Sequence, residues 1–178
     1  MASFFTHPVV PLTLGFVLGS KRLPIRYWLL GAIASMAADG DVLAFALRIP
    51  YESPFGHRGA THSISFALVL AGLMTLREWR HFAAHALLFG FLFASAISHP
   101  LLDMLTDGGL GVALFWPVTA ARFFFPVTPV AVSPIGAAFF STDGAEVIRS
   151  ELEWIWIPCA AIATGTILFR KRRLRISK

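Results

Sequence analysis

Five long apolar stretches, separated by short segments that carry most of the charges, dominate this sequence of 178 residues. Apolar residues make up 56% of the chain and charged residues 14%, whereas a typical soluble domain carries about 25% charged residues. A chain with so little charge is typical of a protein whose helices cross a lipid bilayer. A disulfide-built fold is excluded, because Cys159 has no second cysteine with which to pair.

The apolar stretches predict an all-α fold, a polytopic bundle of about five transmembrane helices in one domain over residues 1–169. The stretch 106–151 is apolar but rich in proline and phenylalanine. We expect a re-entrant or interfacial element there, or one more short span. Residues 170–178 form a basic tail. The predicted spans cover residues 4–20, 27–47, 62–76, 82–105 and 152–169.

The lysines and arginines predict how these spans are oriented. Six of the fifteen lie in the last nine positions, and such a cluster beside a span is typical of a cytoplasmic segment near anionic lipid. With five spans and a cytoplasmic C-terminus, eleven of the fifteen fall on the cytoplasmic side and the N-terminus lies outside. We therefore expect a bacterial inner membrane protein whose partner is the lipid bilayer, with no nucleic acid bound.

Ionisable residues within and beside the apolar spans fall at one level of this topology. They come from four separate segments, yet all lie at the outer end of the predicted bundle, although only lysine and arginine were used to orient it. Because an ionisable group inside a span costs about a few kcal/mol, such residues favour a functional site. The residues are His7, Asp39, Asp41, His57, Arg58, His62, His99, Asp103 and Asp107.

The spacing of the acids and histidines favours metal binding. His99, Asp103 and Asp107 recur every four residues and share one helical stripe, so His99 and Asp103 form a workable pair of ligands. Asp107 precedes two glycines and fits a turn or cap equally well. On a regular helix Asp39 and Asp41 point about 200° apart, so either the glycine between them breaks the helix or only one of them faces the site. We therefore favour Asp41 as a ligand, with Asp39 as a second ligand or as a group that orients one.

The densest group of polar side chains runs from His57 to Ser63. It leads into an apolar helix that Thr61 or Ser63 is expected to cap. Arg58, together with the free amides of that helix N-terminus, suits a phosphate or a carboxylate. Arg58, Thr61 and Ser63 are therefore predicted to bind substrate, and the alternative is a solvated loop before a capped helix.

Other ionisable residues are expected to be structural. His81 and His85 also lie four apart, but His85 is about 21 Å along a helix from His99, and we expect the pair to lie at the membrane interface. A further group of acids falls in outer loops with no informative spacing and is expected to be solvated. These acids are Glu52, Asp143, Glu146, Glu151 and Glu153.

Four motifs within residues 6–109 resemble the YdjM-like family of membrane-bound, metal-dependent hydrolases. They are Thr6-His7, Asp39-Gly-Asp41, His57-Arg-Gly-x-Thr-His62-Ser and Ser98-His99-Pro-Leu-Leu-Asp103. The family is distantly similar to zinc-dependent phospholipase C and P1-type nucleases, which are helical enzymes. The chain lacks the HxxxE pair of the phospholipases, which argues against three metal ions. The resemblance implies as ligands His7, Asp41, His62, His99 and Asp103, with Asp39 and His57 as further candidates.

These observations predict an integral-membrane hydrolase that cleaves a phosphoester of a lipid or another amphiphile with a metal-activated water. One or two Zn²⁺ ions are expected, with Mn²⁺ as an alternative. Arg58 would hold the anionic group, and His57 or Asp39 would move the proton. Two other classes stay open. One is a metal or ion transporter, in which polar residues should continue toward the cytoplasm, and the other is a non-catalytic membrane protein.

Overall fold

The computed structural model describes residues 1–81, 84–134, 136–140 and 142–176, and these residues form helices and loops with two isolated β-bridges and no strand. The all-α fold class is confirmed. Short helices of other types are η1 (Ala37–Val42), η2 (Ala60–His62), η3 (Gly136–Phe140) and the π-helical η4 (Leu152–Trp156). The α-helices are α1 (Val9–Leu18), α2 (Ile25–Met36), α3 (Leu43–Ala46), α4 (Ile64–Arg77), α5 (His85–Asp103), α6 (Thr142–Glu151) and α7 (Ile157–Ile176).

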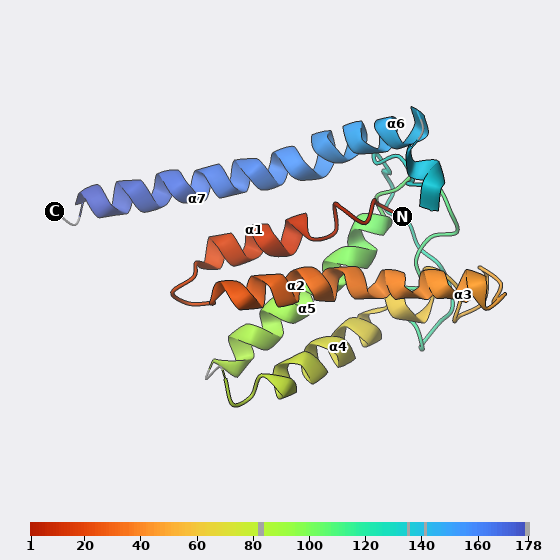
Figure 1. Ribbon diagram of the computed structural model, residues 1–178, viewed down its shortest axis with the longest axis horizontal. Helices are drawn as coiled ribbons and strands as arrows, with labels where there is room; N and C mark the ends of the chain where they lie inside the picture. The colour runs from red at the N-terminus through yellow and green to blue at the C-terminus, as the bar shows by residue number, and fades with distance from the viewer. Residues whose placement is uncertain (82–83, 135, 141, 177–178) are drawn as a thin grey trace.

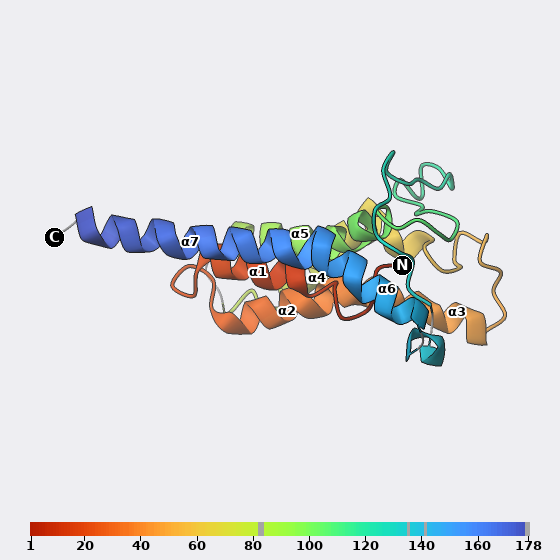
Figure 2. The same ribbon diagram turned by 90° about the horizontal axis from the view of Figure 1, so that it is seen from above.

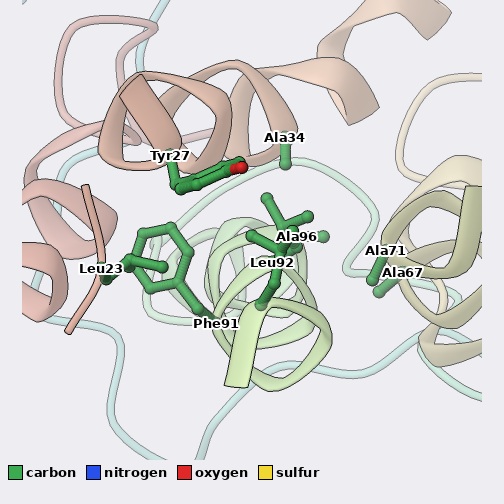
Figure 3. Close-up of a cluster of buried hydrophobic side chains, with 9 residues drawn as sticks. Leu23, Tyr27, Ala34, Ala67, Ala71, Phe91, Leu92 and Ala96 are labelled. Carbon is green, nitrogen blue, oxygen red and sulfur yellow. The ribbon is translucent and has the colours of Figure 1, made fainter. Parts of the chain in front are cut away.

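Helix α5 lies at the centre of the bundle and contacts α1, α2 and α4 (Figure 1). The apolar core between α2, α4 and α5 contains several buried alanines, among them Ala34, Ala67 and Ala96 (Figure 3). Small side chains let helix backbones approach closely, so packing contacts hold the helices together where lipid offers no hydrophobic driving force. Leu92 and Phe91 of α5 fill the space that the alanines leave.

The two ends of the bundle differ in composition (Figure 1). We call one the cluster end; it holds the N-terminal segment 1–8, the loop 47–61 and the segment 104–134. The other, the basic end, holds the connections 19–24 and 78–81 and the last turns of α7. Helix α7 lies against α1 and runs from the cluster end to the basic end (Figure 2). The histidines and aspartates of the candidate site therefore lie far from most of the lysines and arginines.

Three helical stretches are long and apolar enough to cross a membrane: Ile25–Ala46, His85–Asp103 and Thr142–Ile176. Helices α1 and α4 are shorter than the spans predicted at 4–20 and 62–76, with 10 and 14 residues. A 10-residue helix reaches about 15 Å, half of the hydrocarbon core. Helix α4 begins at Ile64 because Ser63 caps it. Of the span predicted at 82–105, residues 82 and 83 lie outside the described residues.

In residues 106–134 and 136–140 the proline-rich stretch forms no spanning helix, and its described residues 142–151 form α6, which belongs to the candidate span Thr142–Ile176. It crosses the cluster end as loops and leads through η3 to α6 (Figure 1). Helix α6 continues through η4 into α7 without leaving helical structure. The described part of the basic tail, residues 170–176, belongs to α7, and residues 177 and 178 lie outside the described residues.

Candidate metal centre

Six histidines and aspartates form two groups of potential metal ligands at the cluster end. Within each group, one ligand atom from every residue lies within 4.8 Å of the others. The residues come from the N-terminal segment, η1, the loop before α4, and α5. The structure thus brings together four segments that are far apart in the sequence. The first group is His7, His99 and Asp103, and the second is Asp39, His57 and His62.

The local structure of η1 explains how Asp39 and Asp41 both reach this site. The stretch is a 3-10 helix rather than an α-helix. At three residues per turn, side chains two residues apart diverge by about 120°. On an α-helix the angle is about 160°, which is the 200° given above measured the shorter way round. Both aspartates are buried, with 9% and 8% of their surface exposed. Of the two alternatives that the sequence leaves open, a break of the regular helix and a single aspartate facing the site, this geometry supports the first.

One ring nitrogen of each of three histidines is held by an oxygen acceptor. Nδ1 of His99 lies 2.6 Å from the carbonyl oxygen of Ser35. Because a carbonyl only accepts hydrogen bonds, this nitrogen carries the proton and Nε2 keeps its lone pair. Asp41 holds Nδ1 of His57 at 2.6 Å and Nδ1 of His62 at 3.0 Å. Because a carboxylate also only accepts hydrogen bonds, Nδ1 of both rings carries the proton and Nε2 keeps its lone pair. Histidines that bind metals have this arrangement.

The unprotonated Nε2 atoms converge on the carboxylates. Nε2 of His62 and Nε2 of His99 are 3.0 Å apart. Oδ1 of Asp39 lies 3.4 Å from Nε2 of His99, and Oδ2 of Asp103 lies 3.4 Å from Nε2 of His62. Two neutral imidazoles would face each other with lone pairs, which repel. With both Nδ1 atoms protonated, this geometry therefore favours a cation between the rings, either a proton or a metal ion.

Several buried atoms of the centre have no hydrogen-bond partner. They include both ring nitrogens of His7, both oxygens of Asp39 and Oδ2 of Asp103. Nε2 of His7 lies 3.7 Å from Oδ1 of Asp103, and its ring stacks on His99 at 3.7 Å. Unpaired buried polar atoms cost about 1–3 kcal/mol each. These nitrogen and oxygen donors are the ligands that Zn²⁺ and Mn²⁺ accept, so the residues fit the predicted metal.

The charges of the centre also favour a bound cation. Asp39, Asp41 and Asp103 carry three negative charges against the guanidinium of Arg58, which leaves a formal charge of −2 when the histidines and the nearby N-terminal amine are neutral. Excess charge in a buried site is costly unless it is compensated. A divalent ion balances this excess.

Asp41 orients ligands rather than binding metal in this geometry. Besides the two histidines, its Oδ2 accepts hydrogen bonds from the backbone N–H of Arg58 at 3.1 Å and from the Thr61 hydroxyl at 2.6 Å. Its lone pairs are therefore engaged, whereas those of Asp39 are free. The structure favours Asp39 as the ligand and Asp41 as the orienting group, the reverse of the sequence-based preference. Thr61, predicted to bind substrate, fixes Asp41 instead.

Arg58 is committed to the protein. Its side chain is fully buried, and its Nε lies 3.2 Å from Oδ2 of Asp103. Its terminal nitrogens donate to the carbonyl of Gly108 and to the hydroxyl of Thr106, both at 2.9 Å. The backbone of Arg58 has φ +60°, a left-handed conformation that these contacts stabilise. The guanidinium positions Asp103, and this geometry does not favour a direct contact with substrate.

Two further polar residues have structural roles. Ser63, also predicted to bind substrate, caps α4: its hydroxyl accepts from the N–H of Phe66 at 3.0 Å and donates to the carbonyl of Ala60 at 2.7 Å. Asp107 lies outside the two ligand groups, and its Oδ1 accepts from the N–H of Val132 at 2.8 Å. Asp107 therefore fixes the loop that crosses the cluster end.

His81 and His85 lie away from the centre, at the basic end. The ring of His85 stacks on Trp79 with 3.7 Å between centroids, and its Nε2 lies 2.8 Å from the carbonyl oxygen of the same residue. His81 is exposed. The two residues provide a natural control for mutations of the buried histidines.

Glu151 was expected to be solvated, and that expectation is wrong. Only 2% of its surface is exposed, and its carboxylate accepts hydrogen bonds from the backbone N–H and hydroxyl of Ser3 and from the Thr6 hydroxyl. The indole N–H of Trp156 donates to the Thr6 hydroxyl at 2.8 Å. These bonds tie the start of the last helical stretch to the segment that carries His7. The one feature of the sequence that could have indicated the burial of Glu151 is its position directly before the last apolar run.

Nothing in the sequence singled out Arg122 as a structural residue. Its guanidinium donates to the carbonyls of Tyr51, Ser53 and His57 at 2.7–3.2 Å. Burial lowers the pKa of this guanidinium. The contacts fasten the segment after α5 to the loop that carries His57.

The helices and the buried site define an integral membrane protein with a potential metal centre at one end of its bundle. The chain belongs to the YdjM inner membrane protein family, whose model matches residues 1–174. It is 41% identical over 174 residues to the inner membrane protein YbcI of Escherichia coli (strain K12), a match that covers 97% of this chain and 100% of that relative. No solved structure matches the chain. The predicted membership of the YdjM family and the inner-membrane location are confirmed, whereas the link to metal-dependent hydrolases and the orientation of the termini stay predictions.

Proposed function

We propose that this protein is a metal-dependent hydrolase of the inner membrane that cleaves a phosphoester of a lipid or another amphiphile. The observation that carries the proposal is the pair of facing Nε2 atoms of His62 and His99, 3.0 Å apart beside carboxylate oxygens of Asp39 and Asp103. An arrangement of this kind favours a cation, and a metal ion satisfies more of its free donors than a proton does.

The ligand sets divide the work among the residues. His7, His99 and Asp103 would hold one ion, and Asp39 and His62 would hold a second, with His57 beside them as the group that moves the proton. A bound Zn²⁺ would lower the pKa of a water to about 7 and polarise the phosphoryl oxygen. Arg58 positions Asp103, and Asp41 orients the histidines of the second set.

His57 is the residue that we favour to carry the proton. Asp41 fixes its Nδ1, so its second ring nitrogen has a set direction, as in the aspartate–histidine pairs of hydrolases. Together with Asp39 and Asp41, His57 has exposed surface, whereas the other histidines of the two sets have none. Solvent therefore reaches the centre from this side, where the rings of Tyr51 and Phe45 flank His57 at 5.4 and 5.7 Å.

The surroundings of this opening support an amphiphilic substrate. Helix α3 follows Asp41 in the chain, and it and the loop after it expose Leu43, Phe45 and Phe55. An apolar cavity of about 200 Å³ lies at the same end and is lined by Phe4, Phe5, Val42, Phe139 and Phe140, among others. Apolar surface beside a polar centre suits a molecule with a phosphoester head and a hydrocarbon tail. We place this end on the outer face of the membrane, because the opposite end carries most of the lysines and arginines.

The apolar core favours a hydrolase over a transporter. A transit site needs polar groups that continue through the membrane. Between the centre and the basic end, the core instead contains Leu88 and Leu92, both fully buried; Figure 3 shows Leu92 among its apolar neighbours. The polar side chains of the centre are thus separated from the basic end by packed hydrocarbon.

The test is hydrolysis by the purified full chain in detergent. A short-chain phosphatidic acid and bis(p-nitrophenyl) phosphate serve as substrates, with Zn²⁺ or Mn²⁺ added or removed by chelation. The proposal predicts metal-dependent hydrolysis that falls at least about 100-fold in His57→Ala and is abolished in His99→Ala, while His81→Ala is unaffected. Equal rates in wild type and His99→Ala would contradict it, as would a metal-loaded wild type that cleaves neither substrate.

A further inference from the structure

Helices α1 and α7 lie side by side (Figure 1). Residues of both helices line a groove at the basic end, far from the metal centre. It consists of a hollow of about 590 Å³ and an adjoining one of about 520 Å³. The two hollows share four lining residues: Leu18, Arg22, Arg170 and Arg173. The groove is therefore a continuous feature at the level where the bundle meets the basic surface.

The wall of the first hollow is apolar. Val17 and Leu18 of α1 face Ile162 and Phe169 of α7 across it. Gly165 contributes to the space, since a Cβ added there would meet no atom within 4 Å. A larger side chain at this position would occupy the hollow without displacing a neighbour.

The end of the groove is strongly basic. Arg170 donates to the carbonyls of Phe16 and Val17, both at 3.0 Å, so its guanidinium is fixed at the C-terminus of α1. Gly19, with φ +83°, leaves room for it, because a Cβ there would lie 2.9 Å from Arg170 Nη2. The guanidinium of Arg173 lies 5.5 Å from the centroid of the Phe169 ring. Among the described residues that line the two hollows there is no carboxylate to neutralise these cations.

We propose that this groove binds one anionic phospholipid, with its phosphate at Arg22 and Arg173 and an acyl chain along the apolar wall. Basic pockets between membrane helices recognise lipid head groups in this way, and the planar guanidinium suits phosphate oxygens. Helix α7 has no buried residue and packs against the bundle mainly through α1. A lipid in the groove would add contacts between α7 and the rest of the bundle.

Native mass spectrometry of the full chain tests this proposal. The protein in detergent is offered an equimolar mixture of phosphatidylglycerol and phosphatidylcholine. We expect preferential retention of one phosphatidylglycerol. Arg22→Gln and Arg173→Gln should each weaken its binding about fivefold, and Gly165→Leu should weaken it by filling the apolar hollow.

Matched controls separate a defined site from general basic character. Arg172→Gln removes the same charge one residue away, at an exposed position that lines neither hollow. Gly90→Leu makes the same change at an exposed helical glycine on α5 with open space around it. The proposal predicts that both controls bind phosphatidylglycerol as the wild type does.

Three results would overturn the proposal. Equal retention of the two lipids would show that the groove does not select an anionic head group. A loss with Arg172→Gln as large as that with Arg173→Gln would assign the binding to the basic surface as a whole. A dimer that Gly165→Leu breaks would assign the groove to a second copy of the chain.

Discussion

The candidate metal centre at the cluster end and the apolar core beneath it are both buried, but they are stabilised differently. In the core, alanines of neighbouring helices face Leu92 and Phe91, and packing alone accounts for its stability. At the cluster end, histidines and aspartates lie close together, and of these only Asp39, Asp41 and His57 have any exposed surface. The core is filled by the chain's own apolar side chains, whereas the centre leaves buried nitrogen and oxygen atoms without hydrogen-bond partners.

The buried polar atoms that lack a hydrogen bond belong to only a few residues at the cluster end. In the part of the chain that the structure describes, the buried side-chain atoms without a hydrogen bond belong to His7, Asp39, Arg58 and Asp103. Glu151, buried at the same end, accepts three hydrogen bonds. Local departures from full hydrogen bonding are expected at functional sites, so the contrast points to the metal centre and not to loose packing of the whole end.

Removing the carboxylate of Asp103 should cause the largest loss in the free energy of unfolding. Asp103→Ala leaves the buried Arg58 without its carboxylate and removes the acceptor of the Ala2 N–H, which lies 2.8 Å from Oδ1. We expect a loss of about 3–5 kcal/mol in the free energy of unfolding, measured by thermal unfolding in detergent. Asp103→Asn keeps the shape and should unfold less readily than Asp103→Ala. Unchanged stability in Asp103→Ala would contradict the ion pair.

A core mutation should lower stability and leave the centre intact. Leu92→Ala opens a cavity between α5 and its neighbours, and we expect it to cost about 2–5 kcal/mol. Because Leu92 belongs to the core and to neither ligand group, the metal content of the folded protein should not change. A Leu92→Ala protein that folds but has lost its metal would show that the two regions are not independent.

Asp41→Asn should weaken metal binding without abolishing it. The amide cannot accept from both His57 and His62 as the carboxylate does, so the rings lose their fixed orientation. Groups of this kind contribute about 10–100-fold to metal affinity, which a competition titration with a chelator measures. Asp107→Asn, outside the ligand groups, is the matched control. An unchanged affinity in Asp41→Asn would refute the orienting role.

The smallest effect is expected at Glu151. Glu151→Gln removes a charged acceptor of the bonds from Ser3 and Thr6, and a bond to a charged group contributes about 1.5–3 kcal/mol. Because the amide retains one oxygen acceptor, we expect a loss of about 1 kcal/mol and faster hydrogen exchange in the N-terminal segment. Glu153→Gln, at an exposed position two residues on, should change neither quantity.

The sequence predicted the helical membrane fold and the group of residues at the site, because apolar runs and buried charges are visible in it directly. It did not predict which aspartate carries free oxygens. That depends on the 3-10 geometry of η1, which follows from packing against the rest of the bundle and not from the spacing of Asp39 and Asp41.

The contacts of Arg58 and Glu151 were also out of reach of the sequence. Arg58 pairs with a residue 45 positions away, and the partners of Glu151 lie near the opposite end of the chain. Contacts of such long range are set by the tertiary fold. From the sequence, Arg58 beside two histidines was therefore interpreted as a residue that binds substrate. Glu151 before an apolar run was interpreted as a solvated charge.

The most direct test of the central claim is the metal content of the purified protein. Elemental analysis should compare the wild type with a His62→Ala/His99→Ala variant and a His81→Ala/His85→Ala control, since both variants remove two histidines. The account predicts one or two equivalents of zinc or manganese per chain in the wild type and the control, and a clear loss in the first variant. A wild type that takes up no stoichiometric metal after reconstitution, or a first variant with unchanged metal content, would contradict it.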